Sequence, residues 1–280
     1  MSRPSIEIRR MSEKLVNIES IGSFFESLSD PRHVRNRKHL LGDIIVISVC
    51  GLICGCDGPT AIHRWAVERV DWLAQFLELP NGIPSRDSIR RLLMALQPAA
   101  FQKCFQKWVS QMIVRDGSGK ARLIAIDGKS CRGSHDAANG LGALHIVSAW
   151  ASEEGIALGQ VATEEKSNEI VAIPELLQQI ELTDSLITID AMGCQKEIAK
   201  TIVQGGGDFA IAVKDNQPKL REAIATHFTK QVEADFEDLR YRRQETHEKG
   251  HGRIDERSYY LTKIPADFAV KKDWPWVKAI

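Results

Sequence analysis

Two apolar runs that each end in an aspartate constrain the fold of this chain more than any other feature. Residues 123–126 lead into Asp127, and residues 186–189 lead into Asp190. Short apolar runs of this kind are typical of buried strands. An ionised carboxylate is costly to bury unless it is paired or holds a metal, and two adjacent carboxylates repel each other. The pair therefore predicts a sheet edge at which Asp127 and Asp190 share a divalent cation.

A single aspartate in such a place is more simply a strand-end or turn residue, whereas two in matching contexts favour a metal site. Mg²⁺ takes oxygen ligands at about 2.0–2.1 Å and keeps positions for water and phosphate. Two such ions about 3.5–4 Å apart can stabilise both the attacking and the leaving oxygen of a displacement at phosphorus. We therefore interpret the pair as a site for phosphoryl transfer that depends on Mg²⁺ or Mn²⁺.

The elements expected around the two aspartates predict an α/β fold. Strands are expected at residues 123–126, 144–151, 156–163, 186–189 and 208–213, and helices at residues 168–180 and 195–203. This order resembles the ribonuclease-H-like arrangement, in which the first and fourth strands are parallel neighbours. We therefore expect a ribonuclease-H-like mixed sheet with flanking helices, and Asp127 beside Asp190.

The rest of the chain divides at a short polar segment. Residues 1–115 have helical spacing, and residues 116–120 (Asp-Gly-Ser-Gly-Lys) have the composition of a linker. We expect an all-helical domain over 1–115 and a catalytic domain over 121–280. Within the latter, residues 217–280 are expected to be a β-rich insertion, with a hairpin that turns at residues 250–252.

Charge is balanced overall but not along the chain. The 37 basic and 37 acidic residues give a net charge of zero. Residues 1–120 carry 17 basic and 12 acidic side chains, a net of +5, and the remaining residues carry 20 and 25, a net of −5. A polar, basic segment lies at residues 32–39. This distribution is typical of a DNA-holding part joined to a carboxylate-rich catalytic part.

The six cysteines and the apolar runs point to a cytoplasmic chain without a membrane partner. The cysteines are scattered among apolar neighbours, without a C-x-x-C pair and a matching distant partner, which favours small buried thiols in a reducing compartment over a metal cluster. The longest apolar run, residues 44–56, spans 13 residues, whereas a membrane span needs about 20. No apolar export signal follows the first residues.

Several charged residues near the expected sheet edge are candidates for contacts with DNA phosphates. Arginine contacts phosphate as a bidentate fork and lysine as a point charge. Solvated surface charge is the alternative for each of them. The candidates are Lys129, Arg132, Lys214 and Arg253.

Five segments together resemble the bacterial insertion-sequence DDE transposases of the H-repeat-associated type. They are residues 25–32, 124–129, 189–195, 213–217 and 251–254. The resemblance implies a helical associated domain, a ribonuclease-H-like catalytic domain, and Asp127 and Asp190 as the first two acids of a triad. It implies a divalent-metal cofactor, transposon terminal repeats and target DNA as partners, and a homodimer. The implied chemistry is nicking at transposon ends, followed by attack of the freed 3′-hydroxyl on target DNA.

This chain departs from the family pattern at the third acid. In the family it is a glutamate on a helix after the β-rich insertion, and no segment here matches it. Residues 273–280 look like the strand that precedes this helix. The resemblance therefore implies a C-terminally truncated transposase, impaired because the third acid is absent, with Asp255 or Glu256 as substitute acids. A hairpin with alternating charges is the simpler reading of those two residues.

Two other functions remain open from the sequence. A non-catalytic DNA-binding remnant could repress transposition by occupying the ends. The arginines at positions 86, 90 and 91 would then matter most, unless they form a solvated helix face. A structure-selective nuclease or ribonuclease H would use the same pair of aspartates without a preference for terminal repeats.

Overall fold

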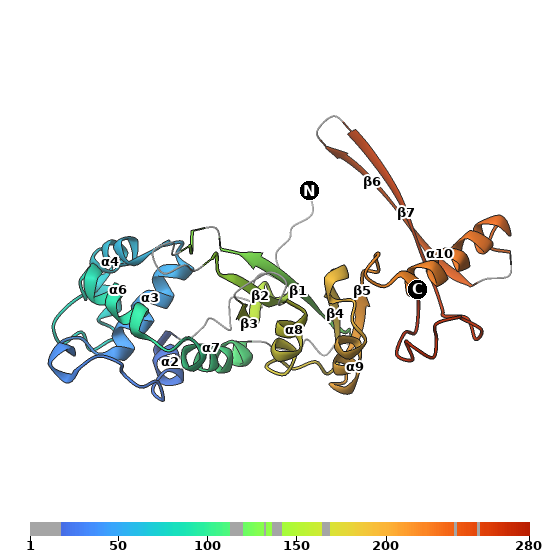
Figure 1. Ribbon diagram of the computed structural model, residues 1–280. Coiled ribbons are helices and arrows are strands. Elements are labelled where there is room, and N and C mark those ends of the chain that lie inside the picture. Colours follow the sequence, from blue (N-terminus) through green and yellow to red (C-terminus); the bar gives the residue numbers. More distant parts are fainter. Residues whose placement is uncertain are drawn as a thin grey trace. The chain divides into compact units, whose positions relative to one another are not determined.

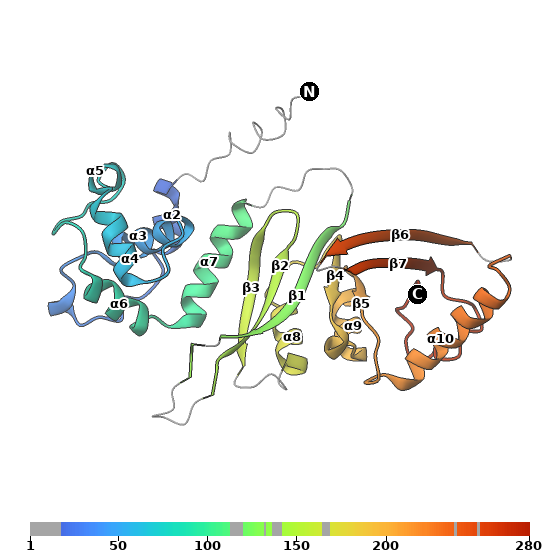
Figure 2. The same ribbon diagram turned by 90° about the horizontal axis from the view of Figure 1, so that it is seen from above.

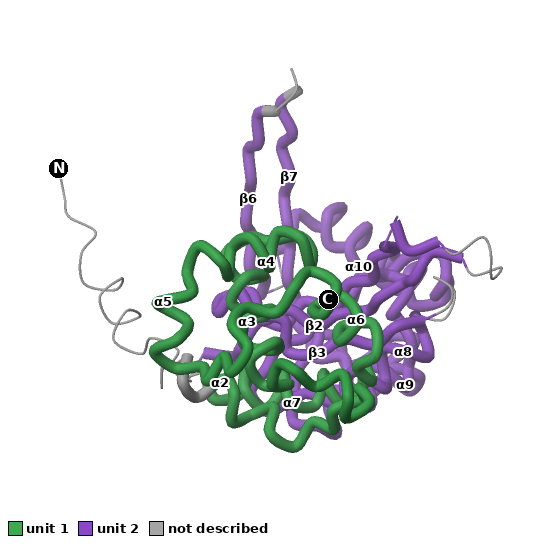
Figure 3. The backbone as a smooth tube through the Cα atoms, turned by 90° about the vertical axis from the view of Figure 1, so that its left-hand side faces the viewer, with its two compact units in different colours: residues 1–116 green, residues 117–280 purple. Residues whose placement is uncertain are grey.

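The computed structural model describes residues 18–112, 120–131, 133–135, 142–163, 169–237, 240–250 and 253–280 (Figure 1). The chain divides into two compact units, Met1–Asp116 and Gly117–Ile280 (Figure 3). Arg132 and residues 116–119 of the expected linker lie outside the described residues.

Unit 1 is helical throughout its described part. Its elements are α2 (Ile18–Phe24), the 3-10 turn η1 (Val34–Asn36), α3 (Leu41–Ile53), α4 (Pro59–Val67), α5 (Val70–Leu73), α6 (Arg86–Ala95) and α7 (Pro98–Met112). Helix α3 forms the centre, because every residue from Asp43 to Gly51 is buried. This is why its sequence is apolar on all sides, as expected for a helix surrounded by others.

Unit 2 contains a five-stranded mixed sheet. The strands are β1 (Arg122–Ser130), β2 (His145–Ala151), β3 (Ile156–Thr163), β4 (Ser185–Ile189) and β5 (Asp208–Ile211), in the order β3-β2-β1-β4-β5 (Figure 2). Strands β1, β2 and β3 form an antiparallel meander, whereas β1, β4 and β5 run parallel. The prediction of a mixed α/β fold is confirmed.

Two helices make the parallel connections. Parallel neighbours need a crossover rather than a tight turn, and α8 (Glu169–Leu177) and α9 (Lys196–Gln204) supply it. Helix α8 packs against β2 and β3, and α9 packs against β5. Their buried faces include Ile173 and Ile198. The two helices thereby cover apolar residues of the sheet. The carboxyl ends of the parallel strands lie together at one edge.

The C-terminal part adds a long helix and a hairpin. Helix α10 (Pro218–Glu233) is followed by β6 (Tyr241–Gly250) and β7 (Arg253–Thr262), which form a separate two-stranded sheet. Of the strand expected at residues 273–280 only the end forms. Residues 278–280 pair with residues 262–264 through three backbone hydrogen bonds and the bridge Lys263↔Ala279, whereas residues 271–273 and 275–276 form turns. Pro275 has no N–H to donate to a ladder, and the neighbouring Trp274 is buried in a cluster with Leu220.

All six cysteines are free thiols. Cys50, Cys104 and Cys194 are buried, and burial raises the pKa of Cys50 to about 11. A thiol that stays protonated, as this raised pKa implies for Cys50, is a poor nucleophile and a poor metal ligand. The prediction of small buried thiols holds for these three cysteines through their burial, whereas Cys54 is exposed and Cys56 and Cys131 are half-buried. None of the helices that the structure describes is both long enough and apolar enough to cross a membrane.

Candidate active site

The register of β1 and β4 brings the two aspartates to neighbouring positions. The parallel ladder between the two strands ends at the pair Ile126↔Ile189. The residues that directly follow this pair are Asp127 and Asp190. Strand β5 ends beside them, because Ile189 pairs with Ile211 and its carbonyl accepts a hydrogen bond from Ala212 N at 3.2 Å. Three parallel strands therefore deliver their carboxyl ends to one edge, where α/β sheets bind ligands.

The two aspartates are held in different ways. Strand β1 does not end at Ile126 as expected but continues to Ser130, because it stays paired with β2, so Asp127 lies within a strand opposite Ser148. Asp190 follows β4 and caps the 3-10 turn η4 (Ala191–Gly193), where its Oδ1 accepts a hydrogen bond from Met192 N at 3.0 Å. That bond fixes the direction of the Asp190 carboxylate.

Both carboxylates are exposed, so the expectation of a charge at a buried position is wrong. Their exposure follows from their place just past the end of the parallel ladder. The side chains are accessible to a cation, to water and to a large substrate. In the described ranges no three His, Cys, Asp or Glu side chains gather into a group that could hold a metal ion. Two accessible carboxylates fit Mg²⁺, which typically keeps several waters and substrate phosphates as its other ligands.

A turn after β5 holds the segment that follows Asp190. Asn216 Nδ2 donates to the carbonyl of Ala191 at 2.5 Å, and Gln217 Nε2 donates to the carbonyl of Cys194 at 2.8 Å. The sequence indicated only a turn here, and nothing in it could show which distant carbonyls these amides reach. Two of the candidate phosphate contacts are on segments of this site, Lys129 on β1 and Lys214 in this turn. Both side chains are exposed and therefore accessible to DNA.

A chain of polar side chains, buried at His145 and Glu169 and exposed at Ser130, lies near Asp127. Ser130 Oγ is 2.9 Å from His145 Nδ1, and His145 Nε2 is 2.6 Å from Glu169 Oε1. The side chains of His145 and Glu169 are only 2% and 7% exposed. A Cβ atom at Gly128 would come within 2.3 Å of Glu169 Oε1 and 2.7 Å of His145 Nε2. The glycine beside Asp127 therefore leaves room for this pair.

The sequence prediction missed His145 and Glu169. The available signal was weak, because a polar residue that opens an apolar strand, as His145 does, is normally read as the strand boundary. Only the fold brings the first residue of α8 against the first residue of β2.

Two family models match the chain. One, described as DDE_Tnp_1-associated, matches residues 23–109. The other, the transposase DDE domain, matches residues 118–267, which is more than half of the chain. This chain belongs to the DDE-domain transposase family. Members of this family act on DNA with divalent metal ions, and Asp127 and Asp190 both lie within the matched DDE domain.

Similar proteins carry transposase names as well. The putative transposase YncI of Escherichia coli strain K12 is 40% identical over 250 residues, which cover 89% of this chain and 98% of that protein. The H repeat-associated putative transposase YbfD of the same strain is 36% identical over 241 residues, covering 85% and 92%. These relatives confirm the resemblance to H-repeat-associated transposases.

Among solved structures, a piggyBac transposase synaptic complex with hairpin DNA has a TM-score of 0.38 and 12% identity, covering 74% of this chain and 53% of that one. A likeness at this level carries no conclusion about this DDE transposase.

The remaining candidate residues of this transposase lie on the hairpin. Arg253 pairs through its backbone with Gly250 at the start of β7. Asp255 Oδ2 lies 3.4 Å from Arg257 Nη2, and Glu256 Oε1 lies 3.4 Å from His247 Nδ1. Both acids are exposed, and each contacts a side chain of its own hairpin, Asp255 the guanidinium of Arg257 and Glu256 the ring of His247. Neither joins the two aspartates in a three-residue group among the described side chains.

Proposed function

We propose that this chain is a transposase for metal-dependent cleavage and transfer of DNA strands at the ends of an insertion sequence, and that its activity is impaired because no third acid joins Asp127 and Asp190 among the described residues. The catalytic domain, residues 121–280, is of the ribonuclease-H-like kind, with residues 217–280 as an insertion, and it follows a helical associated domain over residues 1–115. One observation carries the proposal: the register Ile126↔Ile189 sets Asp127 and Asp190 side by side at the edge where the parallel strands end.

In this proposal the two carboxylates bind Mg²⁺ or Mn²⁺. When bound, the cation stabilises negative charge on the attacking and leaving oxygens at phosphorus. Lys129 and Lys214, together with Arg132 and Arg253, hold the phosphates of terminal repeats and target DNA. In the first step a water oxygen bonds to phosphorus, the P–O3′ bond breaks, and the leaving oxygen takes a proton to become a 3′-hydroxyl. In the second step that 3′-hydroxyl attacks a target phosphate and displaces another 3′ oxygen.

The test is strand cleavage of a duplex that carries the matching terminal repeats, in Mg²⁺ or Mn²⁺. We expect Asp127→Asn and Asp190→Asn each to lower the cleavage rate by more than about 100-fold, because even the loss of a group that only supports a metal ligand costs about 10–100-fold. Asp267→Asn is the matched control, since Asp267 is exposed in a turn of the same unit, and it should keep the parent rate. Undiminished cleavage by both site variants would overturn the proposal.

The same assay addresses the third acid. Asp255→Asn and Glu256→Gln should retain cleavage, because both side chains are paired within their own hairpin. A loss of cleavage in either variant, with binding of the duplex unchanged, would identify that residue as the substitute acid. Light scattering of the complex with paired ends should give the mass of two chains plus that of the bound DNA, as expected for a homodimer.

A second candidate function is a DNA-binding repressor of transposition. The basic loop at residues 30–39 favours it, because that loop offers charge for DNA binding in unit 1, outside the DDE domain. The repressor predicts duplex binding by the parent chain without metal-dependent cleavage, and equal binding by the Asp127→Asn/Asp190→Asn double variant. Cleavage by the parent chain would exclude this candidate.

A further inference from the structure

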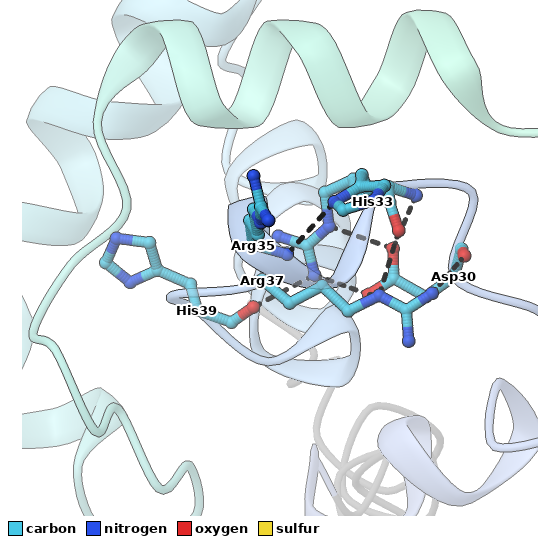
Figure 4. Close-up of polar contacts among 6 residues, drawn as sticks. Asp30, His33, Arg35, Arg37 and His39 are labelled. Carbon is cyan, nitrogen blue, oxygen red and sulfur yellow. Dashed lines mark hydrogen bonds and ion pairs between the residues drawn. The ribbon is translucent and has the colours of Figure 1, made fainter.

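Residues 30–39, called the basic loop here, are folded around a single carboxylate. Asp30 Oδ1 accepts hydrogen bonds from the backbone N of Arg32 at 3.0 Å and from its Nε at 2.9 Å, and Asp30 Oδ2 accepts from Arg32 Nη2 at 2.8 Å (Figure 4). This bidentate pairing is the strongest geometry that arginine offers a carboxylate. The hydrogen bonds from Arg32 hold the pKa of Asp30 below its usual value.

Two guanidinium groups close the basic loop. Arg32 Nη2 also donates to the carbonyl of His39 at 2.9 Å, so it joins both ends of the loop. Arg37 donates from Nη2 to the carbonyl of Asp30 at 3.0 Å and from Nε to the carbonyl of Arg32 at 2.9 Å. Arg32 and Asp30 are largely shielded, with side chains 10% and 13% exposed. These three residues are therefore committed to the shape of the loop.

Two cationic side chains of the basic loop are not committed in this way. Arg35 and Lys38 are exposed, and in the part of the chain that the structure describes neither makes an ion pair or a side-chain hydrogen bond. Four basic residues against Asp30 leave the loop a net charge of +3.

The backbone that carries these two side chains is fixed. The N of Arg35 donates to His33 Nδ1 at 3.3 Å, and the carbonyl of Lys38 accepts a hydrogen bond from Asn81 Nδ2 (Figure 4 shows the former contact). A ligand that meets Arg35 and Lys38 therefore does not have to order the loop first, which is the usual cost of binding to a flexible segment.

We propose that Arg35 and Lys38 bind the phosphate backbone of duplex DNA. The inference rests on the proposed function, which brings DNA to this chain, and it adds a contact surface in unit 1. Exposed arginine and lysine on a rigid loop fit phosphates, whose contacts hold and orient DNA without reading its sequence. Arg32 and Arg37 act only through the shape of the loop.

Two arginines of α6, Arg86 and Arg90, form a competing surface in the same unit. Asp87 lies 3.5 Å from Arg86 Nη2 and 3.9 Å from Arg90 Nε. A phosphate would have to compete with this carboxylate and would meet its repulsion, whereas the carboxylate of the basic loop is engaged by Arg32 and Arg37. Arg86 and Arg90 therefore provide a control with the same number of charges.

The experiment measures binding of the full chain to a short duplex of arbitrary sequence, in EDTA so that cleavage does not interfere, from about 50 to 200 mM salt. Each lost phosphate contact lowers the slope of log K against log salt by about 0.9. We expect Arg35→Ala/Lys38→Ala to lower the slope by about 1.8 and to weaken binding at least tenfold, to about the same extent for every sequence. Arg86→Ala/Arg90→Ala should keep the parent slope, and the charge-preserving Arg35→Lys/Lys38→Arg should restore it.

An unchanged slope in Arg35→Ala/Lys38→Ala, with circular dichroism and melting temperature equal to those of the parent, would overturn the inference. A loss of slope in the α6 variant alone would do the same. The outcome is independent of cleavage. If Asp127 and Asp190 support cleavage while the loop variant binds normally, only this inference fails. If cleavage is absent but binding depends on the loop, only the proposed catalysis fails.

Discussion

At the residue scale, the proposed site depends on the close packing of Gly128 against the buried side chains of His145 and Glu169. The added methyl group of Gly128→Ala would meet Glu169 Oε1 and His145 Nε2, which are buried and cannot move aside freely. We expect the free energy of unfolding to fall by about 1–3 kcal/mol, as in other overpacked interiors, with a loss of cleavage because the strand that carries Asp127 must shift.

Urea denaturation of Gly128→Ala measures this effect. Gly142→Ala is the control, because a Cβ atom at Gly142 meets nothing within 4 Å. Equal stability of the two variants would show that the His145–Glu169 pair yields more readily than its burial indicates.

Two carboxylates of unit 1 have opposite pKa shifts and should respond differently to pH. Hydrogen bonds from Arg32 lower the pKa of Asp30. The ionised carboxylate therefore stabilises the fold fully at a pH above its usual pKa of 3.8, and this stabilisation is lost as the pH falls through the lowered pKa. We expect Asp30→Asn to lower the free energy of unfolding by about 1–2 kcal/mol at pH 7. Denaturant titrations should show the difference from the parent narrowing below pH 3.8.

Asp43→Asn is the matched comparison. Burial raises the pKa of Asp43, so its ionised form costs stability at neutral pH, and this cost is relieved as pH falls toward the raised pKa. An asparagine can still accept the hydrogen bond that Leu79 N donates to Asp43 Oδ2 at 3.0 Å. The variant should therefore be at least as stable as the parent at pH 7. A larger loss than that of Asp30→Asn would contradict both pKa directions.

At the element scale, the turn between β5 and α10 determines how firmly the segment after β4 is held. Gln217→Ala removes the donor to the carbonyl of Cys194 and should cost about 1 kcal/mol of stability. Because this carbonyl lies four residues after Asp190, we expect cleavage to fall about 10-fold, at the lower end of the range for groups that support metal ligands. The loss should shrink when the Mn²⁺ concentration is raised.

The control for the turn is Gln204→Ala at the end of α9, where the side chain is exposed. This variant should keep the parent rate at every Mn²⁺ concentration. If Gln217→Ala loses stability but cleaves at the parent rate, the turn supports the fold and not the position of Asp190.

At the scale of the whole molecule, folding and metal binding should be separable. Structural metal sites unfold when the metal is removed, but Asp127 and Asp190 are exposed and lie outside the buried core. We expect EDTA to abolish cleavage while the melting temperature falls by only a few degrees, which reflects the loss of a bound ligand. Calorimetry with and without EDTA measures this, and unfolding in EDTA would show that the cation is structural.

The types of most elements in the DDE domain, and their order, were predictable from local residue patterns. Apolar alternation predicts β2 and β3, the two aspartate-terminated runs predict β1 and β4, and helical spacing predicts α8 and α9, because these signals are local to each segment. The neighbouring positions of Asp127 and Asp190 could also be predicted, because the order of elements resembles the ribonuclease-H-like arrangement, in which the first and fourth strands are parallel neighbours.

The contacts that each side chain of the site makes could not be predicted from the sequence. Three features of this kind depend on residues that are distant in the sequence. They are the exposure of both aspartates, the packing of the His145–Glu169 pair against Gly128, and the split of the basic loop into arginines that hydrogen-bond within the loop and cations that do not. The strand expected at residues 273–280 is restricted to its last three residues for the same reason, because burial of Trp274 against α10 outweighs a local β-like pattern. Contacts of this kind arise when segments that are distant in the sequence pack together, so a local pattern of residues cannot predict them.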